Sequence, residues 1–69
     1  MSDVFVVTSR VRQNSVVVEI VCRDMQAAES HIKAQGIGHN AQITYDTPRC
    51  RVYETSDARW EVVRRAFVI

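Results

Sequence analysis

The fold is decided by residues 4–22, VFVVTSRVRQNSVVVEIVC. Val4 to Arg12 and Val16 to Cys22 are rich in β-branched residues, which favour strands. The short polar segment Gln13-Asn14-Ser15 separates them, and Asn14 tolerates the left-handed conformation that tight turns require. The stretch therefore predicts a β-hairpin with a loop of about three residues.

A helix is predicted directly after the hairpin. Asp24 is a good N-cap, and Met25 to Gln35 contains helix formers but neither Gly nor Pro. Within this segment Met25, Ala28 and Ile32 recur at the spacing of one apolar helical stripe. Gly36 is placed to end the helix as its C′ residue, and residues 36–40 then form a loop.

Two further strands are predicted in the second half of the chain. Ala41 to Tyr45 and Cys50 to Glu54 have strand composition, and the turn Asp46-Thr47-Pro48-Arg49 lies between them. Thr55 to Ala58 forms a second turn or a helix cap.

The last segment, Arg59 to Ile69, fits two structures. Its apolar residues alternate with charged ones as in a strand, but Trp60, Val63 and Phe67 also fit a helix behind a Ser56 cap. We favour a strand for Arg59 to Arg64, because Val62 would lie off the helical stripe.

These elements predict one α+β domain over residues 1–69. It consists of a small antiparallel sheet of four or five strands with one helix on one face. The order is β-β-α-β-β, followed by a last segment that is strand or helix.

Composition narrows the function classes. The chain is 46% hydrophobic and 25% charged with a formal net charge of +1, which is too small to imply a polyanionic partner by itself. The longest apolar runs have four residues, whereas a membrane helix needs about 20. We expect a cytoplasmic protein without a signal peptide, with reduced cysteines and no contact with membranes.

The sequence carries no sign of catalysis, a metal site or a cofactor. Cys22, Cys50, His31 and His39 lack the paired spacing of a zinc site. We expect both cysteines to face the core. Cys50 lies between Arg49 and Arg51, which would favour a thiolate, but in a strand those side chains point to the opposite face. We therefore predict a protein that is not an enzyme.

One face of the hairpin is left without a cover. A single helix can shield only one face of the sheet, and we place it over Phe5, Val7, Val18 and Ile20. The other face then exposes apolar side chains that form a candidate interface, namely Val4, Val6, Val17 and Val21. Three covers are consistent with this pattern: the C-terminal segment with Trp60, Phe67 and Ile69, a second copy in a homodimer, or a partner protein.

The C-terminal half is rich in arginine. Eight of the nine basic residues in the chain are Arg, and only Lys33 is Lys. The candidate binding residues, for protein or nucleic acid, are Arg49, Arg51, Tyr53, Arg59, Trp60, Arg64 and Arg65. Arg, Tyr and Trp are common hot-spot residues of protein interfaces. Basic residues with interleaved aromatics also suit single-stranded nucleic acid, so a small nucleic-acid-binding protein is the alternative function.

The layout resembles small phage and prophage accessory proteins, some of which are anti-CRISPR inhibitors. The resemblance covers residues 4–63 and is carried by Val4-Phe5-Val6-Val7-Thr8, Val16-Val17-Val18-Glu19, Gln26-Ala27-Ala28, Val52-Tyr53-Glu54 and Arg59-Trp60. Residues 64–69 are not part of that layout. The resemblance implies a non-enzymatic protein in the cytoplasm of the host cell that binds a host protein or protein complex and occludes its surface.

Overall fold

The computed structural model describes residues 2–35 and 40–67, and for residues 2 and 67 it describes the backbone only. It confirms the α+β class with one small antiparallel sheet and one helix. The elements are β1 (Ser2–Val11), β2 (Val17–Cys22), α1 (Met25–Lys33), β3 (Gln42–Thr47), β4 (Cys50–Glu54) and β5 (Ala58–Phe67).

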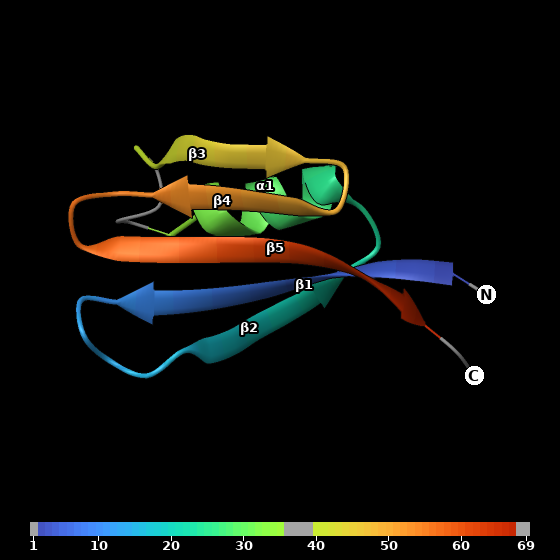
Figure 1. Ribbon diagram of the computed structural model, residues 1–69, viewed down its shortest axis with the longest axis horizontal. Coiled ribbons are helices and arrows are strands. Elements are labelled where there is room, and N and C mark those ends of the chain that lie inside the picture. The colour runs from blue at the N-terminus through green and yellow to red at the C-terminus, as the bar shows by residue number, and fades with distance from the viewer. Residues whose placement is uncertain (1, 36–39, 68–69) are drawn as a thin grey trace.

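The last segment of the chain is a strand in the middle of the sheet. The strand order is β2-β1-β5-β4-β3, so β5 lies between β1 and β4 (Figure 1). Along β5, Trp60 and Val62 are buried while Arg59 is exposed, which is the period-two alternation of a strand. The long β1–β5 pairing, from Ser2 opposite Phe67 to Val11 opposite Ala58, joins the two ends of the chain.

The helix begins where the sequence predicts. Asp24 is its N-cap, and the Asp24 Oδ1 atom accepts a 2.8 Å hydrogen bond from the Ala27 backbone N–H. The helix ends at Lys33, two residues earlier than predicted, and Ala34 is its C-cap. The predicted role of Gly36 lies outside the described residues, as does most of the loop over 36–40.

The core lies between α1 and one face of the sheet, and Figure 1 shows the strands in front of the helix. The buried cluster consists of Val7, Cys22, Ala28, Ile32, Tyr53, Ala58, Trp60 and Val62. Phe5 packs against this cluster. Val18, which we expected beneath the helix, is 63% exposed, so that expectation is wrong.

A β-bulge in β2 explains the position of Val18. Val7 pairs with Ile20, but the next residue, Thr8, pairs with Val18, so Glu19 is an extra residue in β2. An extra residue reverses which side chains face the helix beyond that point. Val17 consequently pairs with the buried Ser9 and lies on the helix side, and Val18 lies on the opposite face.

The hairpin loop also differs from its prediction. The left-handed conformation falls on Arg12, with φ of 55°, whereas Asn14 donates its backbone N–H to the Val11 carbonyl at 3.0 Å. The Arg12 N–H donates a 2.7 Å hydrogen bond to the Asp57 carbonyl, which ties this loop to the turn before β5.

Candidate functional site

The sheet has one face that α1 does not cover, here called the open face. Strand registers place residues side by side across it, because directly paired residues in antiparallel strands share a face. One row runs Val21, Val6, Val63 and Cys50 across β2, β1, β5 and β4. The open face comprises Val4, Val6, Val18, Val21, Tyr45, Cys50, Val52 and Val63.

The open face is partly exposed in a single copy of the chain. Val21 and Tyr45 are each 56% exposed, and the central residues Val6 and Val63 are half-buried by their neighbours. Val52 is buried although it does not belong to the cluster under the helix. The apolar row crosses four of the five strands and ends at Cys50, which lies opposite Thr47 of β3. A contiguous exposed apolar surface is typical of an interaction site.

Charged residues border this apolar row. Arg65 lies opposite Val4 at one end, and Arg10 lies opposite Arg59 at the other. The Arg59 Nη2 atom lies 3.0 Å from Glu61 Oε1 in an exposed ion pair. The open face therefore combines an apolar row with polar side chains: Thr8 and Glu61, which pair with each other, lie beside the row, and arginines lie at the ends of the β1–β5 pair. Protein interfaces commonly combine apolar and polar contacts in this way.

The predicted interface is partly assembled. Val4, Val6 and Val21 lie on the open face, but Val17 does not, because of the bulge in β2. The C-terminal segment is a strand of the sheet, and its Trp60 packs on the helix side. The Phe67 side chain and Ile69 lie outside what the structure describes.

The predicted arginine–aromatic surface is not formed. Tyr53 and Trp60 are 0% exposed and pair with each other across β4 and β5, beneath the helix. The expectation that these rings are available to a partner is therefore wrong. Aromatic residues with large apolar area are buried when a helix covers their face, and sequence neighbours that are charged do not prevent it.

The hydroxyl of Tyr53 explains how this ring is buried. It donates a 2.9 Å hydrogen bond to Glu29 Oε2 of α1 and lies 3.3 Å from Arg51 Nη1, which donates to it. Burial raises the pKa of Tyr53, and Glu29 raises it further, although the Arg51 hydrogen bond opposes them. The pKa of Arg51 is raised by Tyr53 and Asp46. Arg51 and Tyr53 therefore attach β4 to the helix.

The remaining predicted arginines do not form one patch. Arg64 binds the Asp3 carboxylate, and Arg59 binds Glu61. Arg49 lies exposed in the turn between β3 and β4, and its carbonyl accepts a 2.8 Å hydrogen bond from the Arg64 N–H. Arg65 is exposed on the open-face side of β5. Among the described residues, neither Arg49 nor Arg65 has a carboxylate partner within 4.0 Å.

The two cysteines lie on opposite faces of the sheet. Cys22 is buried in the core, as expected, and both burial and Asp24 raise the pKa of its thiol. Cys50 is half-buried on the open face opposite Val63, so the expectation that it faces the core is wrong. Within residues 2–35 and 40–67, no group of three or more His, Cys, Asp or Glu side chains could hold a metal ion.

A polar cluster joins the bulge of β2 to the helix. His31 Nε2 lies 2.9 Å from Glu19 Oε1, and the Gln35 amide donates to the same oxygen. Burial by itself raises the pKa of Glu19, but hydrogen bonds from Ser9, Gln35 and His31 together lower it below its ordinary value. The carboxylate at the bulge is therefore held in its charged form.

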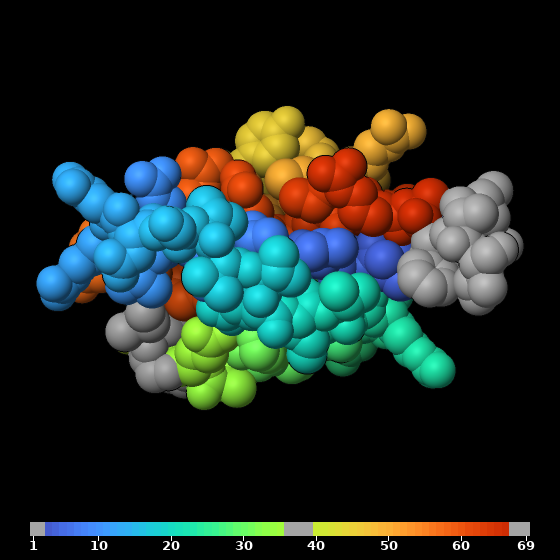
Figure 2. Space-filling view, turned by 90° about the horizontal axis from the view of Figure 1, so that it is seen from below, coloured from blue at the N-terminus to red at the C-terminus, as the bar shows by residue number. Residues whose placement is uncertain are grey.

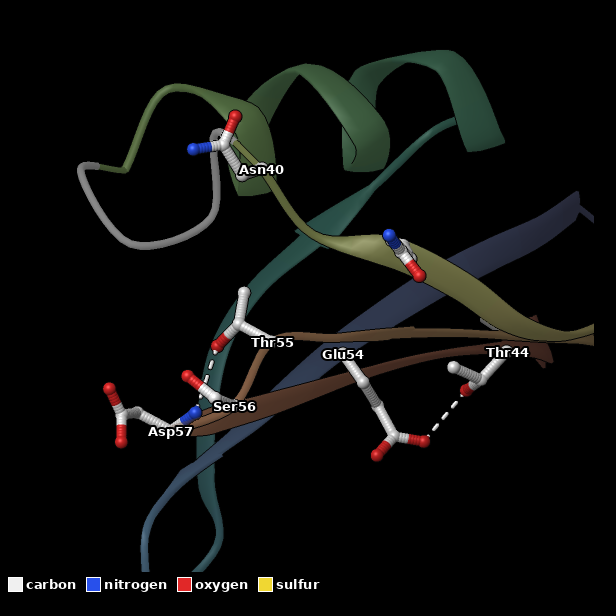
Figure 3. Close-up of a pocket in the computed structure, with 7 residues that line it drawn as sticks. Asn40, Thr44, Glu54, Thr55, Ser56 and Asp57 are labelled. Atoms are coloured by element: carbon white, nitrogen blue, oxygen red, sulfur yellow. Dashed lines mark hydrogen bonds between the residues drawn. The ribbon is translucent and has the colours of Figure 1, made fainter.

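A polar hollow of about 590 Å³ lies where β3 begins and β4 ends, lined by Asn40, Gln42, Thr44, Glu54, Thr55, Ser56 and Asp57 (Figure 3). Thr44 Oγ1 donates a 2.7 Å hydrogen bond to Glu54, and Thr55 Oγ1 accepts the backbone N–H of Asp57 at 3.2 Å. These bonds stabilise the strand pair and the turn before β5, so local structure accounts for them.

Sequence reasoning missed five of the eight apolar residues of the open face. Val18, Tyr45, Cys50, Val52 and Val63 all belong to it. The alternation along β5 could have identified Val63 once that segment was assigned as a strand. Within the described residues no helix is long and apolar enough to cross a membrane. No family model matches the chain, and no curated protein or solved structure shows significant similarity to it.

Proposed function

We propose that this protein is a non-enzymatic interaction module that binds the surface of another protein through its open face. The observation that carries the proposal is the apolar row Val21, Val6, Val63 and Cys50, which crosses four strands on the face opposite the helix. Covering these side chains on binding would remove apolar area from water, which is the main driving force for protein association.

The composition of the rim supports a protein partner rather than a nucleic acid. The rings of Tyr53 and Trp60 lie in the core and are not available to stack on bases. On the open face an apolar row crosses four strands, and the arginines Arg10, Arg59 and Arg65 lie towards the two ends of the β1–β5 pair. Such rim charges contribute to the orientation and rate of binding more than to affinity.

The resemblance to small phage accessory proteins suggests the class of partner. It points to a host protein or protein complex whose surface this chain occludes. Occlusion needs only a complementary surface and requires no catalytic residue.

The proposal is tested by affinity capture from host-cell lysate with three tagged forms of the protein. The first is the wild type. The second is Val63→Lys, which places a charge in the centre of the apolar row. The third is Gln26→Arg, a matched control on the exposed side of the helix.

We expect the wild type and Gln26→Arg to capture the same protein and Val63→Lys to lose it. Circular dichroism establishes that Val63→Lys is folded. Tyr45→Asp serves as a second variant of the open face, because Tyr45 is at an exposed position of that face. Equal capture by all forms, or loss of capture by Gln26→Arg alone, would reject the open face as the binding surface.

A further inference from the structure

The sheet has two edge strands, β2 and β3, and they differ in how many apolar residues they contain. In the described part of the chain, β2 hydrogen-bonds to β1 alone, so its other side is a free edge. Its apolar side chains are exposed on both faces: Val17 on the helix side is 57% exposed, and Val18 and Val21 lie exposed on the open face. Figure 2 views the molecule from this side, with β2 in cyan above the green helix.

The β2 edge lacks the features that prevent an edge strand from pairing with another chain. Proteins protect free edges with charged side chains or proline. The only charged residue of β2 is Glu19, and its carboxylate is held by His31 and Gln35. In the opposite edge strand, β3, four of the six residues are polar, and the strand leads directly into a turn with Pro48. Its one carboxylate, that of Asp46, is bound by Arg51.

The bulge makes β2 complementary to itself. In an antiparallel pair, residues directly opposite each other must share a face. Val18 and Val21 both lie on the open face, whereas Val17 and Cys22 both lie on the helix side. A two-fold axis between Glu19 and Ile20 therefore pairs Val18 with Val21 of a second copy. The same axis pairs Val17 with Cys22. Without the extra residue, one member of each pair would point to the wrong face.

We propose that two copies of this chain associate edge to edge through β2, in antiparallel orientation, with Val18 of each copy opposite Val21 of the other. The pairing adds a backbone ladder and buries valines that are exposed in one copy. It also extends the apolar row, because Val18 of one copy adjoins Val21 of the other. The result is one continuous sheet with both helices on the same side.

The helix leaves room for this arrangement. Ala27 and His31 of α1 lie on one stripe with the C-cap residue Ala34. His31 reaches Glu19 of β2, so this stripe is on the β2 side of the helix. Ala27 and Ala34 are exposed and small. Because the two-fold axis pairs the free edge of β2 in one copy with the same edge in the other, this contact closes at two copies.

Four purified variants test the proposal by multi-angle light scattering and analytical ultracentrifugation, with no partner protein present. Val18→Lys and Val21→Lys each place a charge against a valine of the second copy. The double variant V18K/V21E places the introduced ammonium of each copy opposite the introduced carboxylate of the other. Ile43→Lys is the matched control, an exposed apolar residue on the opposite edge.

We expect the wild type and Ile43→Lys to have twice the mass of one chain. We expect Val18→Lys and Val21→Lys to lose the dimer at the same concentration, and V18K/V21E to recover it. A monomeric wild type, a dimer that survives Val18→Lys, or a double variant that stays monomeric would overturn the proposal. Since no other protein is present, these results are independent of whether the open face binds a partner.

Discussion

Val21 of β2 lies directly opposite Val6 of β1 on the face of the sheet that the helix does not cover. Val6 in turn lies opposite Val63 of β5, so three valines from distant parts of the sequence form one line. The helix has nine residues and one apolar stripe, which it uses on the other face. The protein therefore keeps an apolar surface that its own described elements do not cover.

The two faces of β5 should respond differently to charge. Val62→Lys buries an ammonium group under the helix, because Val62 is fully buried, and should destabilise the protein by about 3 kcal/mol or more. Val63→Lys lies on the open face and should cost about 1 kcal/mol. Urea denaturation of both variants measures the difference. Equal losses of unfolding free energy would mean that both faces are packed within one chain.

Tyr53 should act as a structural residue. Tyr53→Phe removes the hydroxyl that donates to Glu29 at 2.9 Å and should lower the unfolding free energy by about 1 kcal/mol. Because the ring is buried, the same variant should leave capture of the partner protein unchanged. A loss of capture with unchanged stability would show that Tyr53 belongs to the binding surface.

The helix cap can be tested separately. Asp24→Ala removes the side chain that accepts the Ala27 N–H and should cost about 1 kcal/mol of stability. Asp24→Asn, which keeps an accepting oxygen, is the control and should retain most of the stability. Thermal denaturation compares the two, and equal destabilisation by both variants would exclude a capping role.

The unfolding free energy should depend on pH through the ionisation of Glu19. Its pKa is lowered in the folded protein, so the carboxylate contributes stability above its unfolded pKa, and this contribution is lost as the pH falls through the folded value. At pH 7 Glu19→Gln should therefore be less stable than the wild type, by about 1 to 2 kcal/mol. In urea denaturation the difference should shrink as the pH falls below the ordinary glutamate pKa of about 4.3 and should disappear below the lowered folded pKa. A difference that stays constant with pH would show that the charge of Glu19 contributes nothing.

Local patterns predicted the local structure. The hairpin, the helix behind Asp24 and the strand at Cys50 to Glu54 all follow from residue preferences over short spans. The pairing of β1 with β5 does not, because it joins residues that are 47 to 65 positions apart, from Val11 with Ala58 to Ser2 with Phe67, and no residue preference encodes it. The final segment became a strand because that pairing places Trp60 and Val62 in the core.

The candidate site was predicted less well than the fold. The bulge at Glu19 exchanged the faces of Val17 and Val18, and a single extra residue leaves no mark in a run of valines. Tyr53 and Trp60 have charged neighbours in the sequence, which is equally compatible with a surface strand and with a strand that has one buried face. Only the position of the helix decides between these two arrangements.

Site-specific photo-crosslinking tests the central claim most directly. A photoreactive amino acid replaces Tyr45, which is exposed on the open face, or Gln26, which is exposed on the helix. After irradiation in host-cell lysate, a covalent adduct with the partner protein should form from position 45 and not from position 26. Adducts from position 26 alone, or equally from both positions, would contradict binding through the uncovered side of the sheet.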